Sequence, residues 1–235
     1  KNVETGKKFI EKWRDFSPLI IPGVFCHSPV TCSSETLTRA MEVSRLYEVP
    51  LQIHLSETSE EVSQIRSRSG KRPGHYLDQL DLLNPSLIAA HGIHLDENEI
   101  ALMAARGVKV VHVPESNMKL GSGTARVTDM LKRGMIVGLG TDGACSNNDL
   151  DLFLEMDNAA KLAKLTDMDP TSLSALDTLR MATVGGASVL GLQDEIGTLE
   201  AGKRADIITV DLKHPHLCPL HHPASTLVYV QTVRM

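Results

Sequence analysis

The hydrophobic and polar positions of this chain alternate between two patterns, a short apolar run and a longer stretch with helical spacing. Residues 3–16 place apolar side chains on one side of a helix, so they predict an amphipathic helix. Short apolar runs then recur, and a stretch of helical spacing follows each of them. We expect strands at Leu19–Phe25, Pro50–His54, Ser86–Ala90, Val108–Val113 and Met135–Leu139, and helices at about 35–48, 59–67, 97–106, 127–133 and 150–164.

Strands that alternate with helices in this way predict a parallel α/β architecture. The expected strands are apolar along nearly their whole length, as strands are when both faces of a sheet are covered. A (β/α)₈ barrel and an open doubly wound sheet both bind ligands at the C-terminal ends of their strands, so the alternation alone does not choose between them. A nucleotide-binding doubly wound domain would carry a glycine-rich first turn, and no such turn follows the first expected strand.

The pattern changes after residue 165. Two further helices are expected at 170–181 and 184–190, followed by a turn and a strand at Ile207–Asp211. A loop rich in proline and histidine then leads to an expected final strand at Ser225–Val233. We therefore divide the chain into a main segment, 1–195, and a terminal β segment, 196–235.

Composition narrows the function classes. The 235 residues are 42% hydrophobic and 23% charged, which is typical of a globular protein. The net charge of −5, without a basic run, argues against nucleic acid as a partner. Apolar stretches fall short of the roughly 18 residues that span a bilayer, so no membrane partner is expected. The four cysteines form no CxxC pair and predict a reduced, cytoplasmic protein.

Four polar residues stand at or just past the ends of the expected strands: His54, Glu57, His91 and Asp142. Residues three apart in a strand point to opposite faces. Glu57 can therefore approach His54 only if the chain has already turned after the strand. Neutral imidazoles and carboxylates are ligands that zinc or iron accepts, and a carboxylate beside a metal-bound water can move protons.

Each of these residues also has a simpler explanation. A histidine at a strand end is often only a hydrogen-bonded packing residue. Asp142 precedes a glycine and could be a turn residue, and Glu57 could be an acid stabilised at a helix N-terminus. His27, before Ser-Pro, could have a purely structural role in its loop. The joint placement of the four strand-end residues favours a shared site over four independent structural roles.

Four segments resemble the amidohydrolase superfamily, and within it the branch of the methylthioadenosine/S-adenosylhomocysteine deaminases and the triazine chlorohydrolases. The resemblance covers almost the whole chain, and its motifs come in order on successive strands. The segments are Ile53–Thr58, Ala89–Leu95, Pro114–Gly123 and Leu139–Asn148.

The resemblance implies a fold and a role for each matching residue. The fold is a partial (β/α)₈ barrel, strands four to eight in 1–195, with a remnant of a small β-sandwich in 196–235. His54 and Asp142 resemble metal ligands, and Asp142 also takes a proton from the hydrolytic water. Glu57 resembles the acid/base residue that protonates a ring nitrogen of the substrate. His91 resembles the histidine that contacts the water or the metal, and His27 a substrate-binding residue.

One departure concerns the metal ligands. The family supplies two more of them from a His-x-His motif on barrel strand one, and no such motif precedes His54. The only match is His214-Pro215-His216, after the expected barrel. The chain is therefore expected to begin just before strand four, and His91 would have to serve as a third ligand. Without the two ligands of that motif, the chain is expected to bind a metal ion weakly.

The resemblance thus predicts a hydrolytic deaminase that uses one divalent metal ion, zinc or else iron, on a small aminated heterocycle of the adenosine type. Two alternatives stay open. One is a chlorohydrolase or aminohydrolase of triazine-like rings, and the other is a non-catalytic remnant that kept the fold. Assembly into a homo-oligomer is also left open.

Overall fold

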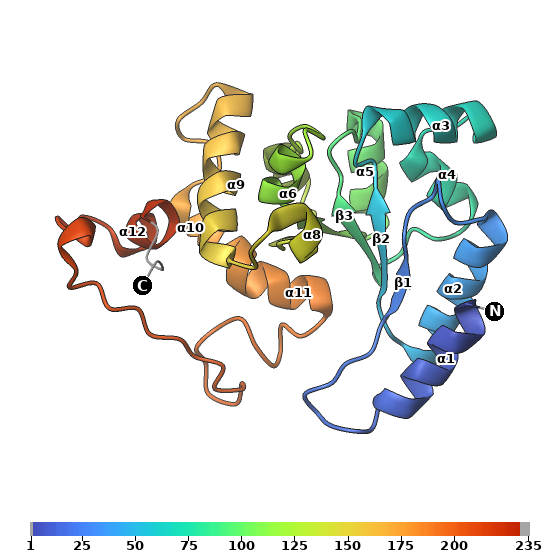
Figure 1. Cartoon of the computed structure of the whole chain (residues 1–235), viewed down its shortest axis with the longest axis horizontal. Helices are drawn as coiled ribbons and strands as arrows, with labels where there is room; N and C mark the ends of the chain where they lie inside the picture. The colour runs from blue at the N-terminus through green and yellow to red at the C-terminus, as the bar shows by residue number, and fades with distance from the viewer. Residues whose placement is uncertain (1, 231–235) are drawn as a thin grey trace. The chain divides into compact units, whose positions relative to one another are not determined.

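A computed structural model describes residues 2–230 of the chain. The chain divides into two compact units, which are considered separately below. The first unit is the described part of Lys1–Val110 together with Arg133–Met135, and the second is the described part of Val111–Lys132 and Ile136–Met235. Five strands follow one another in sheet order β1-β2-β3-β4-β5, and the first three are labelled in Figure 1. Strand β4 (Lys109–His112) begins in the first unit and ends in the second.

The first unit alternates strands and helices as the sequence predicts. Strands β1 and β2 pair in parallel, with Val24 opposite Leu51, and β2 and β3 pair in parallel, with Leu51 opposite Leu87. The α/β class and the parallel sheet are therefore confirmed. The elements are α1 (Asn2–Trp13), β1 (Val24–Cys26), α2 (Ser34–Tyr47), β2 (Leu51–Leu55), α3 (Ser59–Ser69), α4 (Pro73–Gln79), β3 (Leu87–His91) and α5 (Glu97–Ala105).

Burial follows from the apolar pattern of the strands. All five residues of β3 are buried, whereas β2 buries Leu51, Ile53 and Leu55 and leaves the intervening positions more open. Each fully buried leucine or isoleucine side chain stabilises the fold by about 1.5–3 kcal/mol. Beside the sheet, α1 packs on α2 through a small cluster centred on Ile10 and Val43 (Figure 1).

Local signals define where the helices of this unit begin. The Ser33 side chain accepts a hydrogen bond from the Thr36 N–H and caps α2, as its position before the apolar pattern predicts. Asp96 and Glu99 form a reciprocal capping box at the start of α5. Short helix α4 was not expected from the sequence, because seven residues are too few to show a clear helical period.

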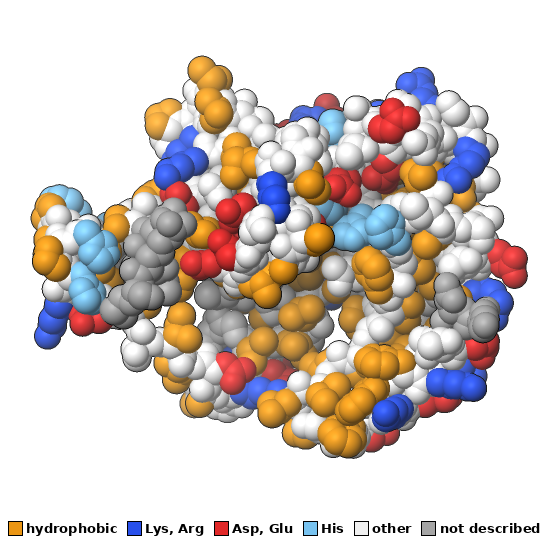
Figure 2. All heavy atoms as spheres, viewed as in Figure 1, with side chains coloured by type: hydrophobic (Ala, Val, Ile, Leu, Met, Phe, Trp, Pro, Cys, Tyr) orange, Lys and Arg blue, Asp and Glu red, His pale blue; other side chains and the backbone are white. Residues whose placement is uncertain are grey.

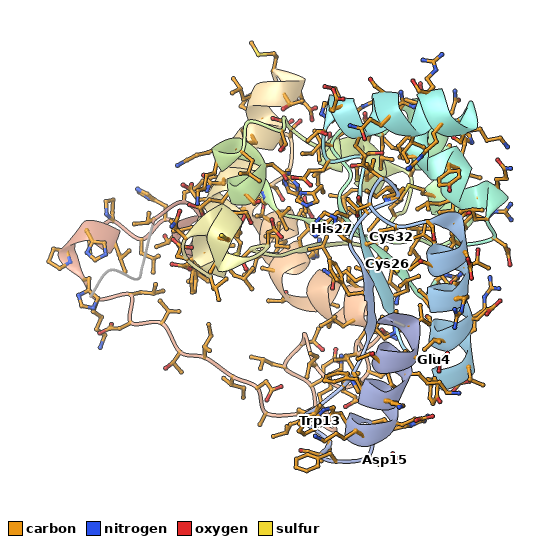
Figure 3. The ribbon with its side chains drawn as sticks, turned by 45° about the vertical axis from the view of Figure 1, so that its right-hand side comes forward. Glu4, Trp13, Asp15, Cys26, His27 and Cys32 are labelled. Atoms are coloured by element: carbon orange, nitrogen blue, oxygen red, sulfur yellow. The ribbon has the colours of Figure 1, made fainter. Side chains whose placement is uncertain are left out.

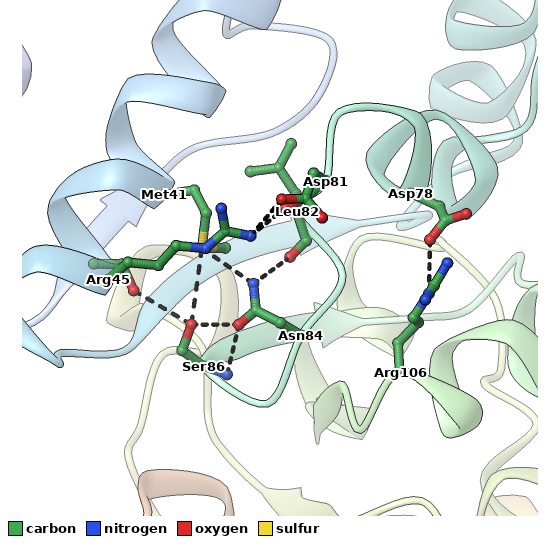
Figure 4. A network of polar contacts seen from close by, with 9 residues as sticks. Met41, Arg45, Asp78, Asp81, Leu82, Asn84, Ser86 and Arg106 are labelled. Atoms are coloured by element: carbon green, nitrogen blue, oxygen red, sulfur yellow. Dashed lines mark hydrogen bonds and ion pairs between the residues drawn. The ribbon is translucent and has the colours of Figure 1, made fainter.

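A network of polar contacts fixes the loop that leads from α4 into β3 (Figure 4). Arg45 of α2 donates to both the backbone and the side chain of Asp81. Asn84 accepts hydrogen bonds from the backbone and the hydroxyl of Ser86. Because Ser86 immediately precedes β3, this network sets where that strand starts and hence where its last residue ends.

The second unit contains β5 and most of the short helices. Glycine lets the segment after α10 approach β5 closely, since a Cβ on Gly185 would lie 2.7 Å from the carbonyl oxygen of Val137. Its elements are α6 (Pro114–Lys119), α7 (Val127–Lys132), β5 (Val137–Leu139), α8 (Ala144–Asn147), α9 (Leu152–Asp167), α10 (Ala175–Arg180), the π-helix η1 (Met181–Gly185), α11 (Gly186–Leu190), the 3₁₀-helix η2 (Pro215–Leu217) and α12 (Pro223–Tyr229).

Three strand predictions were wrong in part or in whole. The expected strand at Leu19–Phe25 is reduced to β1, because Pro22 has no N–H to give to a ladder. Ile207–Asp211 has no regular structure, since a strand needs a neighbour to pair with and the described residues offer it none. The expected strand Ser225–Val233 is largely helix α12, which starts with Pro223 at its first turn, and its last three residues lie outside the described range.

Among residues 2–230, no helix combines the length and the apolar character needed to cross a membrane.

Candidate metal centre

Two neighbouring strands of the first unit end in histidines that face each other. His54 is the penultimate residue of β2, His91 is the last residue of β3, and the register places Leu55 opposite His91. The His54 Nδ1 atom lies 2.9 Å from the His91 Nε2 atom. The His91 side chain is buried, at 1% exposed. Two imidazole nitrogens this close either share one proton or turn both lone pairs toward a cation.

Glu57 joins the two histidines because the chain turns sharply after β2. Ser56 has a left-handed backbone with φ of 51°, so Glu57 leaves the alternation of the strand. One Glu57 carboxylate oxygen lies 3.6 Å from the His91 Nε2 atom. Ligand atoms of His54, Glu57 and His91 all lie within 4.8 Å of one another. The structure thus brings three of the four predicted residues together.

A buried glutamate on α3 holds this turn in place. The N–H groups of Ser56 and Glu57 donate to the two carboxylate oxygens of Glu61, at 2.8 and 2.9 Å. The Glu61 backbone N–H in turn donates to the Thr58 hydroxyl, which caps α3. Burial raises the pKa of Glu61 to about 7.

His27 directly follows β1 (Figure 3) and contacts His54 of the cluster. Its ring centroid is 5.3 Å from that of His54, and its Nδ1 atom is 2.8 Å from the Thr31 hydroxyl. The side chain is exposed, and histidines reach the surface near the ends of β1 and β2 (Figure 2). Burial raises the pKa of the adjacent Cys26 thiol to about 12, so it supplies no thiolate at neutral pH.

The donor set fits a divalent metal ion. Two imidazole nitrogens and one carboxylate oxygen are ligand types that zinc and iron accept. The carboxylate of Glu57 remains partly open to solvent, with its side chain 26% exposed, while His91 is enclosed. Such a set can hold a metal ion at the C-terminal ends of two strands.

Asp142 lies in the second unit, three residues after β5. Its backbone is left-handed, with φ of 60°. One carboxylate oxygen accepts hydrogen bonds from the hydroxyls of Ser116 and Ser146, at 2.7 and 2.6 Å. These donors stabilise the charged carboxylate and fix its orientation. That Asp142 completes the cluster of the first unit stays a prediction.

A second buried glutamate organises the loop around Asp142. Glu155 of α9 is fully buried and accepts from the Glu115 N–H and from the Asn147 side-chain amide, at 3.1 and 2.6 Å. The Asn147 amide also donates to the carbonyl oxygen of Thr141, next to Asp142. Burial raises the pKa of Glu155 to about 7.

Sequence reasoning missed these supporting residues. Glu61 carried a usable signal, because Thr58-Ser59-Glu60-Glu61 has the T-x-x-E spacing of a capping box. Its carboxylate serves the turn before the helix cap instead of the cap residue itself. Ser116 and Ser146 had no such signal, since only the fold brings two residues from separate short helices, α6 and α8, to one carboxylate.

Comparison with known proteins gives this arrangement a context. A family profile described as "Amidohydrolase family" matches residues 2–234. The chain belongs to the amidohydrolase family. The resemblance seen in the four strand-end segments is therefore confirmed.

Relatives in this family are named as deaminases. The chain is 51% identical to a 5-methylthioadenosine/S-adenosylhomocysteine deaminase of Syntrophobacter fumaroxidans, over 97% of this chain and 52% of that protein. It is 44% identical to a 5'-deoxyadenosine deaminase of Methanosarcina mazei, over 97% of this chain and 52% of that protein. The chain spans about half the length of the curated relatives it matches.

Solved structures agree with the family. An adenosine deaminase from Xanthomonas campestris, with bound zinc, is 43% identical and superposes with a TM-score of 0.93, over 96% of this chain and 51% of that one. An atrazine chlorohydrolase from Arthrobacter aurescens, complexed with zinc, is 26% identical and superposes with a TM-score of 0.89. The match covers 96% of this chain and 50% of that one.

Proposed function

We propose that this chain forms part of the catalytic domain of a metal-dependent deaminase that acts on adenosine-type compounds. The observation that carries the proposal is the convergence of His54, Glu57 and His91 at the C-terminal ends of two parallel strands. That edge is where barrel enzymes of the α/β class build their active sites. Relatives that are 44–51% identical are named as deaminases of methylthioadenosine, S-adenosylhomocysteine or 5'-deoxyadenosine.

In this proposal His54, His91 and Asp142 hold one divalent ion, with zinc preferred over iron because zinc is bound in two similar structures. Held by these residues, a zinc ion would supply Lewis-acid chemistry that lowers the pKa of a water molecule to about 7. Asp142 would accept a proton from the attacking water. Ser116 and Ser146 keep the receiving carboxylate turned to one orientation.

Glu57 manages the protons of the substrate. Its carboxylic acid form donates to the ring nitrogen beside the attacked carbon, so that negative charge does not build up there. The water oxygen then forms a bond to the ring carbon, and the bond from that carbon to the amino nitrogen breaks. The nitrogen leaves as ammonia with the proton that Asp142 received, and the second proton of the water passes from the new hydroxyl to Glu57, which restores its acid form. The exposed ring of His27, beside His54, contacts the rest of the substrate.

The finer assignment of the fold belongs to the same proposal. The parallel strands would be strands four to eight of a (β/α)₈ barrel formed by 1–195, and 196–235 would contribute to a small β-sandwich. The TM-score of 0.93 with a zinc-bound adenosine deaminase supports this assignment. We also propose a cytoplasmic location, which the four unpaired cysteine thiols support. Homo-oligomer formation stays open.

A second candidate is hydrolysis of a triazine-like ring, with chloride or an amine as the leaving group. The likeness to the atrazine chlorohydrolase favours it, because the same constellation of residues would activate the same water. The deaminase is preferred because that likeness rests on 26% identity, against 43% for the adenosine deaminase.

Steady-state kinetics on the full-length, zinc-loaded protein test the proposal. The substrates are 5'-methylthioadenosine, 5'-deoxyadenosine, S-adenosylhomocysteine and a chlorotriazine, with release of ammonia or chloride as the readout. We expect ammonia from the adenosine compounds and a loss of at least roughly 100-fold in kcat for Glu57→Gln. Glu60→Gln is the matched control, because Glu60 is exposed on the helix that follows. Turnover of the chlorotriazine alone, or of no substrate, would reject the deaminase.

A further inference from the structure

We propose that Glu61 is a positioning residue for the reaction, acting through the Glu57 carboxylate. This inference rests on the proposed function, because it assigns Glu57 its acid/base role. The juxtaposition behind it is direct. Both carboxylate oxygens of Glu61 accept backbone N–H groups from the two consecutive residues that form the turn after β2, Ser56 and Glu57.

The turn needs such a partner because its backbone is strained and its polar groups are buried. Ser56 is a non-glycine residue in the left-handed region, a conformation that persists only when its surroundings hold it there. Its side chain is completely enclosed. An N–H left without an acceptor in that place would add the penalty of an unpaired buried donor. Glu61 satisfies both N–H groups at once.

The carbonyl side of the same segment is fixed by the chain that follows β3. Gly92 donates its N–H to the Leu55 carbonyl, and His94 donates its N–H to the Ser56 carbonyl, at 3.0 and 2.9 Å. The turn is therefore held from two sides, by the His91 loop through its carbonyls and by Glu61 through its N–H groups. Together these bonds set the distance between the Glu57 carboxylate and the His91 ring.

Only a carboxylate can make both contacts with two acceptor oxygens in this geometry. A glutamine at position 61 would present one oxygen and one NH₂ group, so one of the two backbone N–H groups would face another donor. Glu61 also lies in the first turn of α3, where the helix dipole stabilises a negative charge. That position partly offsets the cost of burying the charge. The chemistry at this position thus requires a carboxylate.

The first experiment measures kinetics of Glu61→Gln against Glu60→Gln in the full-length, zinc-loaded protein. Glu60 is the adjacent residue, and its carboxylate accepts from the exposed Gln64 side chain on the surface of α3. We expect kcat of Glu61→Gln to fall about 10- to 100-fold, because misplacement of a catalytic group by about 1 Å has effects of this size. KM should stay within about threefold, and Glu60→Gln should match the wild type.

The second experiment measures hydrogen exchange of the backbone amides and does not depend on activity. In Glu61→Gln the Ser56 and Glu57 amides should exchange faster, while the Ile65 amide in the middle of α3 should be unchanged. Unchanged exchange at Ser56 and Glu57 would overturn the inference, as would an unchanged kcat. A fall in kcat that follows a general loss of folded protein would overturn it as well.

Failure of the variant to fold and absence of wild-type activity can each be distinguished from failure of the inference. If Glu61→Gln does not fold, Glu61→Asp takes its place, because it keeps the charge and shortens the reach to the two N–H groups. The same changes in exchange and kcat are then expected, to a smaller extent. If the wild type releases no ammonia, the proposed function fails. The amide exchange then still decides whether Glu61 holds the turn.

Discussion

The Nδ1 atom of His54 and the Nε2 atom of His91 lie 2.9 Å apart across the ends of two adjacent parallel strands. The parallel register sets Leu55 and not His54 opposite His91, so regular alternation would point the two imidazoles to opposite faces. The left-handed backbone of His91, with φ of 72°, breaks the alternation at that residue and allows the two rings to approach. The strand register and the backbone conformation at His91 together place the two imidazoles side by side.

Replacement of His91 should therefore remove most of the metal affinity. His91→Asn keeps a polar side chain of smaller size and deletes one of two imidazole donors, so we expect the zinc content after dialysis to fall by at least about tenfold. Elemental analysis of the dialysed full-length protein measures it. His75→Asn, in α4 and outside the cluster, is the control and should retain zinc like the wild type. Equal zinc content in both variants would contradict the assignment.

Much of the sheet and part of the site could be predicted from the sequence. Strands buried on both faces, such as Leu87–His91, produce an apolar run that is easy to recognise, and their C-terminal ends are the place to look for polar residues. His54 and His91 were found in this way. The approach of Glu57 could be stated only as a condition, because the left-handed conformation of Ser56 leaves no trace in its residue type.

The terminal segment shows where the sequence pattern fails. Ile207–Asp211 and Ser225–Val233 have the residue types of strands, yet the first has no regular structure and the second forms α12 over much of its length. Strand propensity reflects packing against neighbours, so the same residues adopt other conformations where no partner strand pairs with them. The role of Glu155 could not be predicted for a related reason, since its partners come from two separate short helices, α6 and α8.

The two serines that contact Asp142 should matter for turnover. The double variant Ser116→Ala, Ser146→Ala removes both hydroxyl donors from one carboxylate oxygen, so Asp142 loses the two contacts that fix its orientation. We expect kcat to fall about 10- to 100-fold, as is usual for partners of a metal-binding or proton-accepting group. Ser172→Ala, which removes a hydroxyl that donates to the exposed Asp167 carboxylate, should leave kcat unchanged. Wild-type turnover by the double variant would count against a role for Asp142.

The buried carboxyl of Glu155 should make stability depend on pH. Its pKa rises from 4.5 to about 7 on folding, mainly through burial and with the nearby acids Glu115 and Asp149 adding to the rise. The stabilisation is therefore fully present below pH 4.5 and is lost as the pH rises through about 7.

The loss is on the order of 3 kcal/mol, since each pKa unit corresponds to about 1.36 kcal/mol. Glu155→Gln cannot ionise, so its free energy of unfolding should decrease less than that of the wild type between about pH 5 and pH 8. Denaturant titrations at a series of pH values measure both curves. Parallel curves for the two proteins would mean that Glu155 does not titrate in this range.

Close packing at the end of β5 should make Gly140 sensitive to substitution, whereas Gly143, three residues later, should tolerate an alanine. A Cβ on Gly140 would lie 2.6 Å from the Val111 side chain, so Gly140→Ala must displace a packed residue. We expect a loss of about 1–3 kcal/mol in the free energy of unfolding. Gly143 has a φ of −82°, and no other atom lies within 4 Å of the place that a Cβ would take there. Gly143→Ala should therefore be neutral or stabilise by up to about 1 kcal/mol.

Gly140 and Gly143 flank the Thr141–Asp142 turn, so the two variants compare the space available on the two sides of that turn. Urea unfolding with unchanged m-values measures the difference, and equal midpoints for the two variants would show that Val111 can move aside at little cost.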